Sequence, residues 1–356
     1  MNGAPLVFYE RVFSNIRKLT LEEASELSGT FGKRAQCAYL GYASYSVAVE
    51  DGSEVSGHVR IECSKRELHK PEEIDAVPKK FVRAVSIYME DAKNENVCRN
   101  VVKRFPYGIY VCVLRSSFIN KAWIDFACRL KALKTIMICY KLEDDSLRLF
   151  KKLVDCGNLL LLHTYEDACE GGMMEVLKSL LCQDQFEELE IKNDGEIPCK
   201  GYVVRELLQF WSQNNEKLRG KHLFVLEKCE DSVKQLEEFV IHRKLSALVP
   251  RLLSTPGIIS VPECLSLLGI QWALKRCSKE ECDAVDKYYR QHHKIIANPS
   301  CVYKFEEGQR CDLRRLYISF ECTSGRDIEE IRPASHTGHD QLSLMRGTGL
   351  LHLVFD

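Results

Sequence analysis

The amino-acid sequence predicts an α/β fold in which repeated βα units build a parallel sheet. Between residues 81 and 244, a short apolar run rich in β-branched residues alternates six times with an amphipathic helical pattern. The starts of the first five β-like runs lie 24 to 27 residues apart, and the last step is 36. A lone βα unit cannot bury both of its faces, so a repeat of this length is typical of a stacked solenoid. Such arrays usually bind other molecules and seldom catalyse reactions.

Each repeat supplies one strand and one crossover helix, as parallel strands require. The expected strands cover residues 83–87, 109–114, 135–140, 159–163, 186–191 and 222–226. The expected helices cover residues 96–105, 120–130, 144–156, 173–182, 202–218 and 232–242. An open doubly wound sheet is the alternative for the same pattern. The solenoid is favoured because the spacing is even and no glycine-rich phosphate turn follows any strand.

Two regions precede the array, which is expected at residues 81–245. Residues 1–35 carry apolar side chains at helical spacing and predict a helical segment. Residues 36–80 predict a hairpin and a linker. Asp51-Gly52 is the turn signal between two alternating runs, and the second strand is expected to start several residues after it.

Two further regions follow the array. Residues 246–322 predict a pair of helices, at 262–276 and 279–294, and then a β-hairpin formed by 302–306 and 315–320. Residues 323–356 mix Gly, Ser, His and Arg with little periodicity. They predict a disordered tail with a short apolar end at Leu350 to Phe355.

Composition limits the classes of partner. Lys and Arg number 50 against 51 Asp and Glu, which gives no electrostatic reason to expect a nucleic acid or an anionic membrane. The N-terminus has no apolar core of a signal peptide, and the longest aliphatic run, Leu159 to Leu162, is far too short to span a bilayer. The 17 cysteines mostly stand singly on apolar faces, so free thiols in a cytoplasmic or nuclear compartment are expected.

No convincing catalytic, cofactor or metal site emerges from the motifs. Cys277, Cys282, His292, His293 and Cys301 form the most metal-like set, but their spacing is irregular and no C-x2-C occurs. His163 ends an apolar strand and is expected to be structural. Acidic runs such as Glu187-Glu188 suit exposed faces better than paired catalytic carboxylates. The expectation is therefore a protein without catalytic residues, cofactor or metal.

Residues 4–13, Ala-Pro-Leu-Val-Phe-Tyr-Glu-Arg-Val-Phe, are similar to an F-box opening, except that Leu6-Val7 replaces the usual leucine pair. Further motifs stand in the middle of the chain, at 186–191, 209–211 and 217–221, and at the end, at 302–308 and 315–322. Together these motifs, which are scattered over most of residues 1–322, resemble nematode F-box-like protein families with βα, leucine-rich-like repeats.

The resemblance implies a substrate receptor of a cullin-type ubiquitin ligase. The F-box helices would dock on a Skp-type adaptor, and the repeat array would hold the target protein. Carried over by position, Pro5, Phe8, Val12 and Phe13 would form the docking face. The alternatives are a stand-alone repeat scaffold without a ligase link and an α/β enzyme. A pocket at the carboxyl ends of the strands would favour the enzyme, and an exposed continuous sheet face would favour binding.

Overall fold

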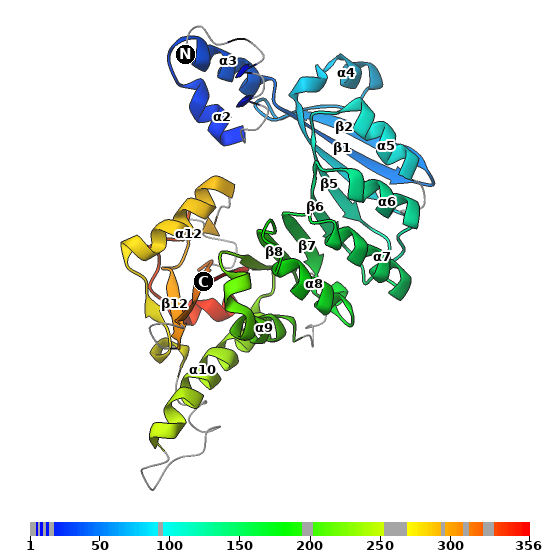
Figure 1. The fold of residues 1–356 in the computed structure, drawn as a ribbon. Helices are drawn as coiled ribbons and strands as arrows, with labels where there is room; N and C mark the ends of the chain where they lie inside the picture. The colour runs from blue at the N-terminus through cyan, green and yellow to red at the C-terminus, as the bar shows by residue number, and fades with distance from the viewer. Residues whose placement is uncertain are drawn as a thin grey trace. The chain divides into compact units, whose positions relative to one another are not determined.

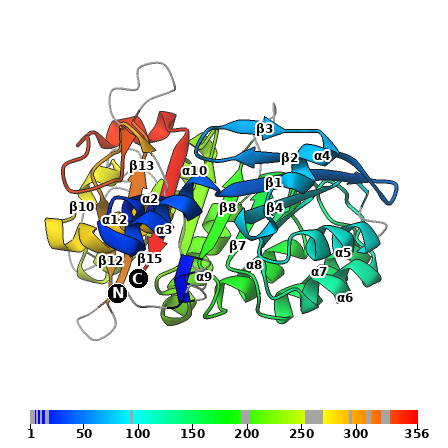
Figure 2. The ribbon, with the colours of Figure 1, turned by 90° about the horizontal axis from the view of Figure 1, so that it is seen from above.

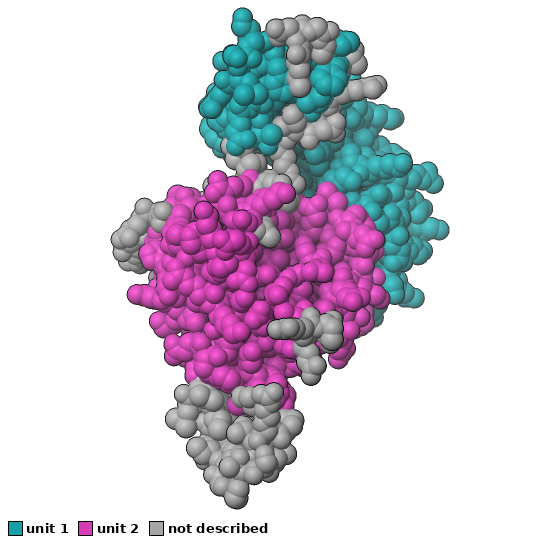
Figure 3. Space-filling model, turned by 60° about the vertical axis from the view of Figure 1, so that its left-hand side comes forward, with its two compact units in different colours: residues 1–159 teal, residues 160–356 magenta. Residues whose placement is uncertain are grey.

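The computed structural model describes residues 5, 8–9, 12–13, 18–91, 95–193, 202–252, 269–292, 296–308, 313–322 and 331–356. The chain divides into two compact units, residues 1–159 and 160–356 (Figures 1 and 3). The boundary falls inside the predicted repeat array. Each unit contains a mostly parallel or mixed sheet with helices packed against it, so the predicted α/β class is confirmed.

Unit 1 begins with two helices, continues with a hairpin and ends with three βα repeats. Its elements are α2 (Lys18–Ser25), α3 (Gly29–Leu40), β1 (Ala43–Glu50), β2 (Ser53–Ile61), β3 (Arg66–Leu68), α4 (Pro71–Ala76), η1 (Lys79–Phe81), β4 (Val82–Met89), α5 (Glu95–Arg104), β5 (Ile109–Leu114), α6 (Lys121–Arg129), β6 (Leu133–Ile138) and α7 (Asp144–Asp155). The strand order is β3-β2-β1-β4-β5-β6. Strands β1, β4, β5 and β6 are parallel, whereas at the edge β2 is antiparallel to β1 and β3 is antiparallel to β2.

The hairpin belongs to the same sheet as the repeats, because β1 pairs in parallel with β4. Asp51 and Gly52 both have positive φ, 45° and 73°, as a two-residue type I′ turn requires. Strand β2 therefore starts directly at Ser53, and the prediction of a later start is wrong. The residues after the turn pair with β1 through their backbone while their polar side chains face solvent.

The helices of unit 1 cover one face of its sheet. Figures 1 and 2 show α5, α6 and α7 side by side on this face. Tyr45 and Tyr110 point to it, and the Tyr45 ring centroid lies 4.6 Å from that of Phe105, directly after α5. Helix α6 begins where the Asn120 side chain accepts a 2.7 Å hydrogen bond from the Trp123 backbone N–H.

Unit 2 contains three further parallel strands and an antiparallel extension. Its elements are β7 (Leu161–Tyr165), η2 (Glu166–Cys169), α8 (Met173–Leu181), β8 (Glu188–Lys192), α9 (Val203–Leu218), β9 (His222–Leu226), α10 (Glu230–Leu252), η3 (Ile270–Trp272), β10 (Lys275–Arg276), α12 (Lys279–His292), β11 (Ile296–Ala297), β12 (Tyr303–Glu307), β13 (Arg314–Phe320), β14 (Ile331–Arg332), η4 (Leu342–Gly347) and β15 (Leu350–Phe355). The strand order is β7-β8-β9-β15-β13-β12-β10, and β11 pairs with β14. The predicted C-terminal hairpin is present as β12 and β13.

The C-terminal residues form the centre of the unit 2 sheet. Strand β15 lies antiparallel between β9 and β13, with Leu353 opposite Leu223 and Ile318. The prediction of a disordered tail over residues 323–356 is therefore wrong for residues 331–356, and residues 323–330 lie outside the described residues. The described part of the predicted helix 262–276 is also not α-helical, since residues 270–272 form a 3-10 turn and 275–276 form β10.

Two layers cover the sheet of unit 2. On one face, Trp211 of α9 lies 6.0 Å from Phe355 between ring centroids. On the other face, Tyr289 of α12 lies 6.3 Å from Phe224. Within each unit the predicted strands follow chain order, as a stacked array would have them. A solenoid is not confirmed, because antiparallel strands extend the parallel strands in both units.

Candidate functional site

The four docking residues that the resemblance suggests lie in different environments. Phe13 is 8% exposed, and its ring centroid lies 5.2 Å from that of Phe31. Val12 is half-buried against the same cluster of residues. Pro5 is exposed, and Phe8 is 45% exposed. The structure thus leaves Pro5 and Phe8 accessible and gives Phe13 a packing role.

The cluster around Phe13 explains why the N-terminal residues stay attached to the two helices that follow. Its buried members are Tyr9, Phe13, Leu21, Ala24 and Ala35. The Arg83 Nη2 atom donates a 3.2 Å hydrogen bond to the carbonyl oxygen of Phe13, which ties this segment to β4. The segment is therefore a small helical body with its own core.

The sheet of unit 1 has one face that helices do not bury, which we call the open face. We define it by half-buried or exposed side chains that alternate along four strands: Ser44, Ser46, Ala48, Ala84, Ser86, Tyr88, Ile109, Val111 and Met137. The parallel registers align these positions, with Ser46 opposite Ser86 and Ser86 opposite Val111. Val113 and Thr135 share this face but are buried.

The opposite side of the same strands is fully buried. Val47, Ile87, Cys112 and Ile136 are each at most 3% exposed. The contrast between the two sides follows from the period of two in a β-strand, where successive side chains point to opposite faces. The open face is therefore a property of the strand pattern itself.

Both ends of the open face carry aromatic or large apolar groups. At the amino ends of the strands, Ile109 is 53% exposed and Tyr107 is 58% exposed. At the carboxyl ends, the Arg115 guanidinium lies 5.0 Å from the centre of the Tyr88 ring. Arg115 Nη1 also donates a 3.0 Å hydrogen bond to Glu90 Oε1. The exposed Tyr107 and the paired Tyr88 and Arg115 are of residue types that are enriched at protein interfaces.

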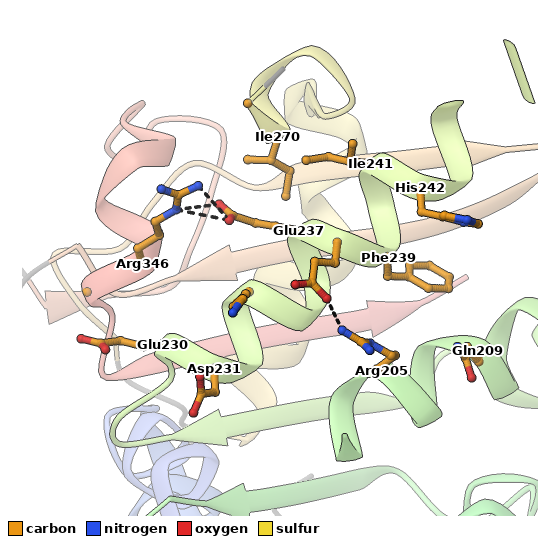
Figure 4. Close-up of a pocket in the computed structure, with 14 residues that line it drawn as sticks. Arg205, Gln209, Glu230, Asp231, Glu237, Phe239, Ile241, His242, Ile270 and Arg346 are labelled. Carbon is orange, nitrogen blue, oxygen red and sulfur yellow. Dashed lines mark hydrogen bonds and ion pairs between the residues drawn. The ribbon is translucent and has the colours of Figure 1, made fainter. Parts of the chain in front are cut away.

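A pocket of about 1180 Å³ lies alongside α10 in unit 2 (Figure 4). Its two arginines already have acidic partners, because Arg205 pairs with Glu238 and Arg346 Nη2 lies 3.0 Å from Glu237 Oε2. The described residues that line it include one histidine, His242, and no serine, threonine, cysteine or tyrosine. Among the described residues, this lining therefore offers no hydroxyl or thiol nucleophile.

Among the described residues, the three cysteines of the metal-like set do not form a metal-binding group. Burial raises the pKa of Cys277 to about 12 and that of Cys282 to about 11. Cys301 Sγ donates a 2.9 Å hydrogen bond to the carbonyl oxygen of Gly338. The His292 side chain and His293 lie outside the described residues. The three buried thiols are better explained as small core side chains.

One other group of side chains does converge in unit 2. His163 of β7 and Glu188 and Glu190 of β8 each place one donor atom within 4.8 Å of the others. The expectation that Glu188 is exposed is wrong, because it is 1% exposed. Among the described residues, this is the group with a geometry that could hold a metal ion.

No family model, curated protein or solved structure matches the chain. In the part of the chain that the structure describes, every helix is too short or too polar to cross a membrane.

Proposed function

We propose that this chain is a non-enzymatic protein-interaction module that holds a protein partner on the open face of unit 1. The observation that carries the proposal is the contrast between the two sides of β1, β4, β5 and β6. One side is buried under helices, and the other presents a row of accessible side chains across four strands. Repeat proteins use such extended sheet surfaces for binding.

We further propose that the N-terminal helical segment contacts a Skp-type adaptor, as the F-box resemblance implies. Exposed Pro5 and Phe8 are the residues available for that contact. The partner on the open face would then be the substrate of a cullin-type ubiquitin ligase. Without adaptor binding, the same open face supports the alternative of a stand-alone scaffold.

Affinity capture with matched variants tests the open face. Ile109→Asp places a charge on this face, and Ile331→Asp changes the same residue type at similar exposure, 59% against 53%, in unit 2. Both are surface changes that should alter stability by only about 0.5 kcal/mol. A partner held on the open face should be recovered with the unmodified chain and Ile331→Asp but not with Ile109→Asp. Equal recovery with both variants would contradict the proposal.

Purified Skp-type adaptor tests the ligase link separately. Phe8→Ala should abolish adaptor binding, whereas Val55→Ala, at an exposed position on β2, should leave it unchanged. If the unmodified chain does not bind the adaptor but still recovers a partner through the open face, the scaffold alternative holds.

A further inference from the structure

The register of two parallel strands brings an imidazole and two carboxylates together in unit 2. Strand β7 places His163 directly opposite Glu190 of β8. Glu188 stands two residues before Glu190, so both side chains point to the same face of the sheet. The convergence therefore follows from the backbone and does not depend on one flexible rotamer.

The spacing of the donor atoms matches that of two ligands around one metal ion. His163 Nδ1 lies 3.4 Å from Glu190 Oε1. Charge-assisted hydrogen bonds are usually shorter, about 2.7–2.9 Å. Two ligands bound at about 2.1 Å to one tetrahedral Zn²⁺ are about 3.4 Å apart. The third donor atom, from Glu188, lies within 4.8 Å of the other two and so needs only a small shift.

Two buried carboxylates lie close together at this place. Glu188 is 1% exposed and Glu190 is 7% exposed, and a carboxylate oxygen of each lies within 4.8 Å of the other. Like charges repel strongly in such surroundings, and a bound cation offsets the repulsion. The His163 side chain is 25% exposed, so the group lies near the protein surface.

A tyrosine from α12 holds one of the carboxylates. The Tyr288 hydroxyl donates a hydrogen bond to Glu188 Oε2. The Tyr288 ring stacks on His222, with 3.3 Å between ring centroids, and His222 Nδ1 lies 3.0 Å from His352 Nε2. Hydrogen bonds of this kind orient the ligands in metal sites and tune their affinity.

We propose that His163, Glu188 and Glu190 bind one divalent transition-metal ion of the Zn²⁺ type. One imidazole with two carboxylates suits such an ion, whereas Mg²⁺ and Ca²⁺ favour all-oxygen sites and Cu(I) favours thiols. Three protein ligands leave a fourth position for water or for a side chain of a bound protein. All three ligands belong to unit 2.

Zinc titration of the full-length, chelator-treated protein measures the stoichiometry and affinity. We expect one Zn²⁺ per chain. His163→Gln and Glu190→Gln should each weaken binding by roughly tenfold or more, and Tyr288→Phe should weaken it by roughly 10–100-fold. Glu175→Gln is the control, because Glu175 is an exposed acid of the same unit, paired with Lys178 on α8. Equal affinity in all variants, or no binding by the unmodified chain, would overturn the proposal.

Cobalt substitution separates this site from the many thiols without any variant. Co²⁺ held by nitrogen and oxygen ligands should give weak visible bands and lack the intense near-ultraviolet band of thiolate coordination. An intense thiolate band in the stoichiometric complex would show that cysteines bind the ion and would overturn the assignment. This measurement holds even if a ligand variant fails to fold, which circular dichroism would reveal.

Discussion

Phe8 and Phe13 show how closely spaced aromatic residues can serve different purposes. Both belong to the apolar stripe that the sequence predicts as a docking face. Only Phe13 lies inside the cluster formed with α2 and α3, whereas Phe8 keeps 45% of its surface exposed. Helical spacing reveals an apolar stripe but does not reveal which part of it another element covers.

Phe13→Ala should therefore destabilise the N-terminal helical segment, and Phe8→Ala should not. Removal of the buried ring is expected to cost about 3–5 kcal/mol, because a cavity remains in the cluster. Loss of the exposed ring should change stability by about 0.5 kcal/mol. Hydrogen exchange at the amides of α2 and α3 would report the difference. Equal protection in both variants would contradict the assigned environments.

Thiol reactivity should follow burial. Burial raises the pKa of Cys229 to about 12 and that of Cys98 to about 11, so both remain protonated thiols near pH 8. Cys37, Cys63 and Cys156 are exposed free thiols. An alkylating reagent at pH 8 should modify these three first, as peptide mass analysis would show. Early modification of Cys98 or Cys229 in the folded protein would contradict the burial.

Glu188 marks a limit of local sequence patterns. A run of acidic residues usually indicates an exposed face, yet Glu188 and Glu190 are buried because α12 covers this side of the sheet. The Tyr288 hydroxyl that reaches Glu188 comes from 100 residues later in the chain. The pairing of His163 with Glu190 likewise depends on a strand register that no local pattern specifies.

At the scale of elements, strong local signals were sufficient for some strands. The bounds of β5 (Ile109–Leu114) and β9 (His222–Leu226) coincide with the prediction. In both cases a glycine shortly precedes an unbroken apolar run. Strand β15 was missed because five apolar residues and one histidine after an irregular stretch show no periodicity, and its partner β9 lies more than a hundred residues earlier.

Strand β15 should be essential for the folding of unit 2. Leu353 is fully buried between β9 and β13, whereas Leu344 in η4 is 37% exposed. Leu353→Ala is expected to cost about 2–5 kcal/mol, and Leu344→Ala is the matched control with a much smaller effect. Urea unfolding of the two variants would measure the difference. Deletion of residues 349–356 should abolish cooperative unfolding of unit 2, and a tail without a structural role would leave it intact.

At the scale of the whole molecule, chain order and strand order agree along the parallel strands of each unit, which are β1, β4, β5 and β6 in unit 1 and β7, β8 and β9 in unit 2. This arrangement places consecutive crossover helices on one side of the sheet, since right-handed crossovers between neighbouring strands all fall on the same face. The other side is left for additional elements or for partners. In unit 2, α12 packs on this other side of the sheet, over β9 and β15. In unit 1, the open face keeps accessible side chains on β1, β4, β5 and β6.

Photo-crosslinking from the open face tests the central claim most directly. A photoreactive amino acid at Val111 or Ser86 should form a crosslink to the same partner protein in matched cell lysate. The same group at Lys151, which is exposed on α7 on the helical side, should not crosslink that partner. Crosslinks from Lys151 alone, or none from the open face while the partner is still recovered, would contradict binding at this surface.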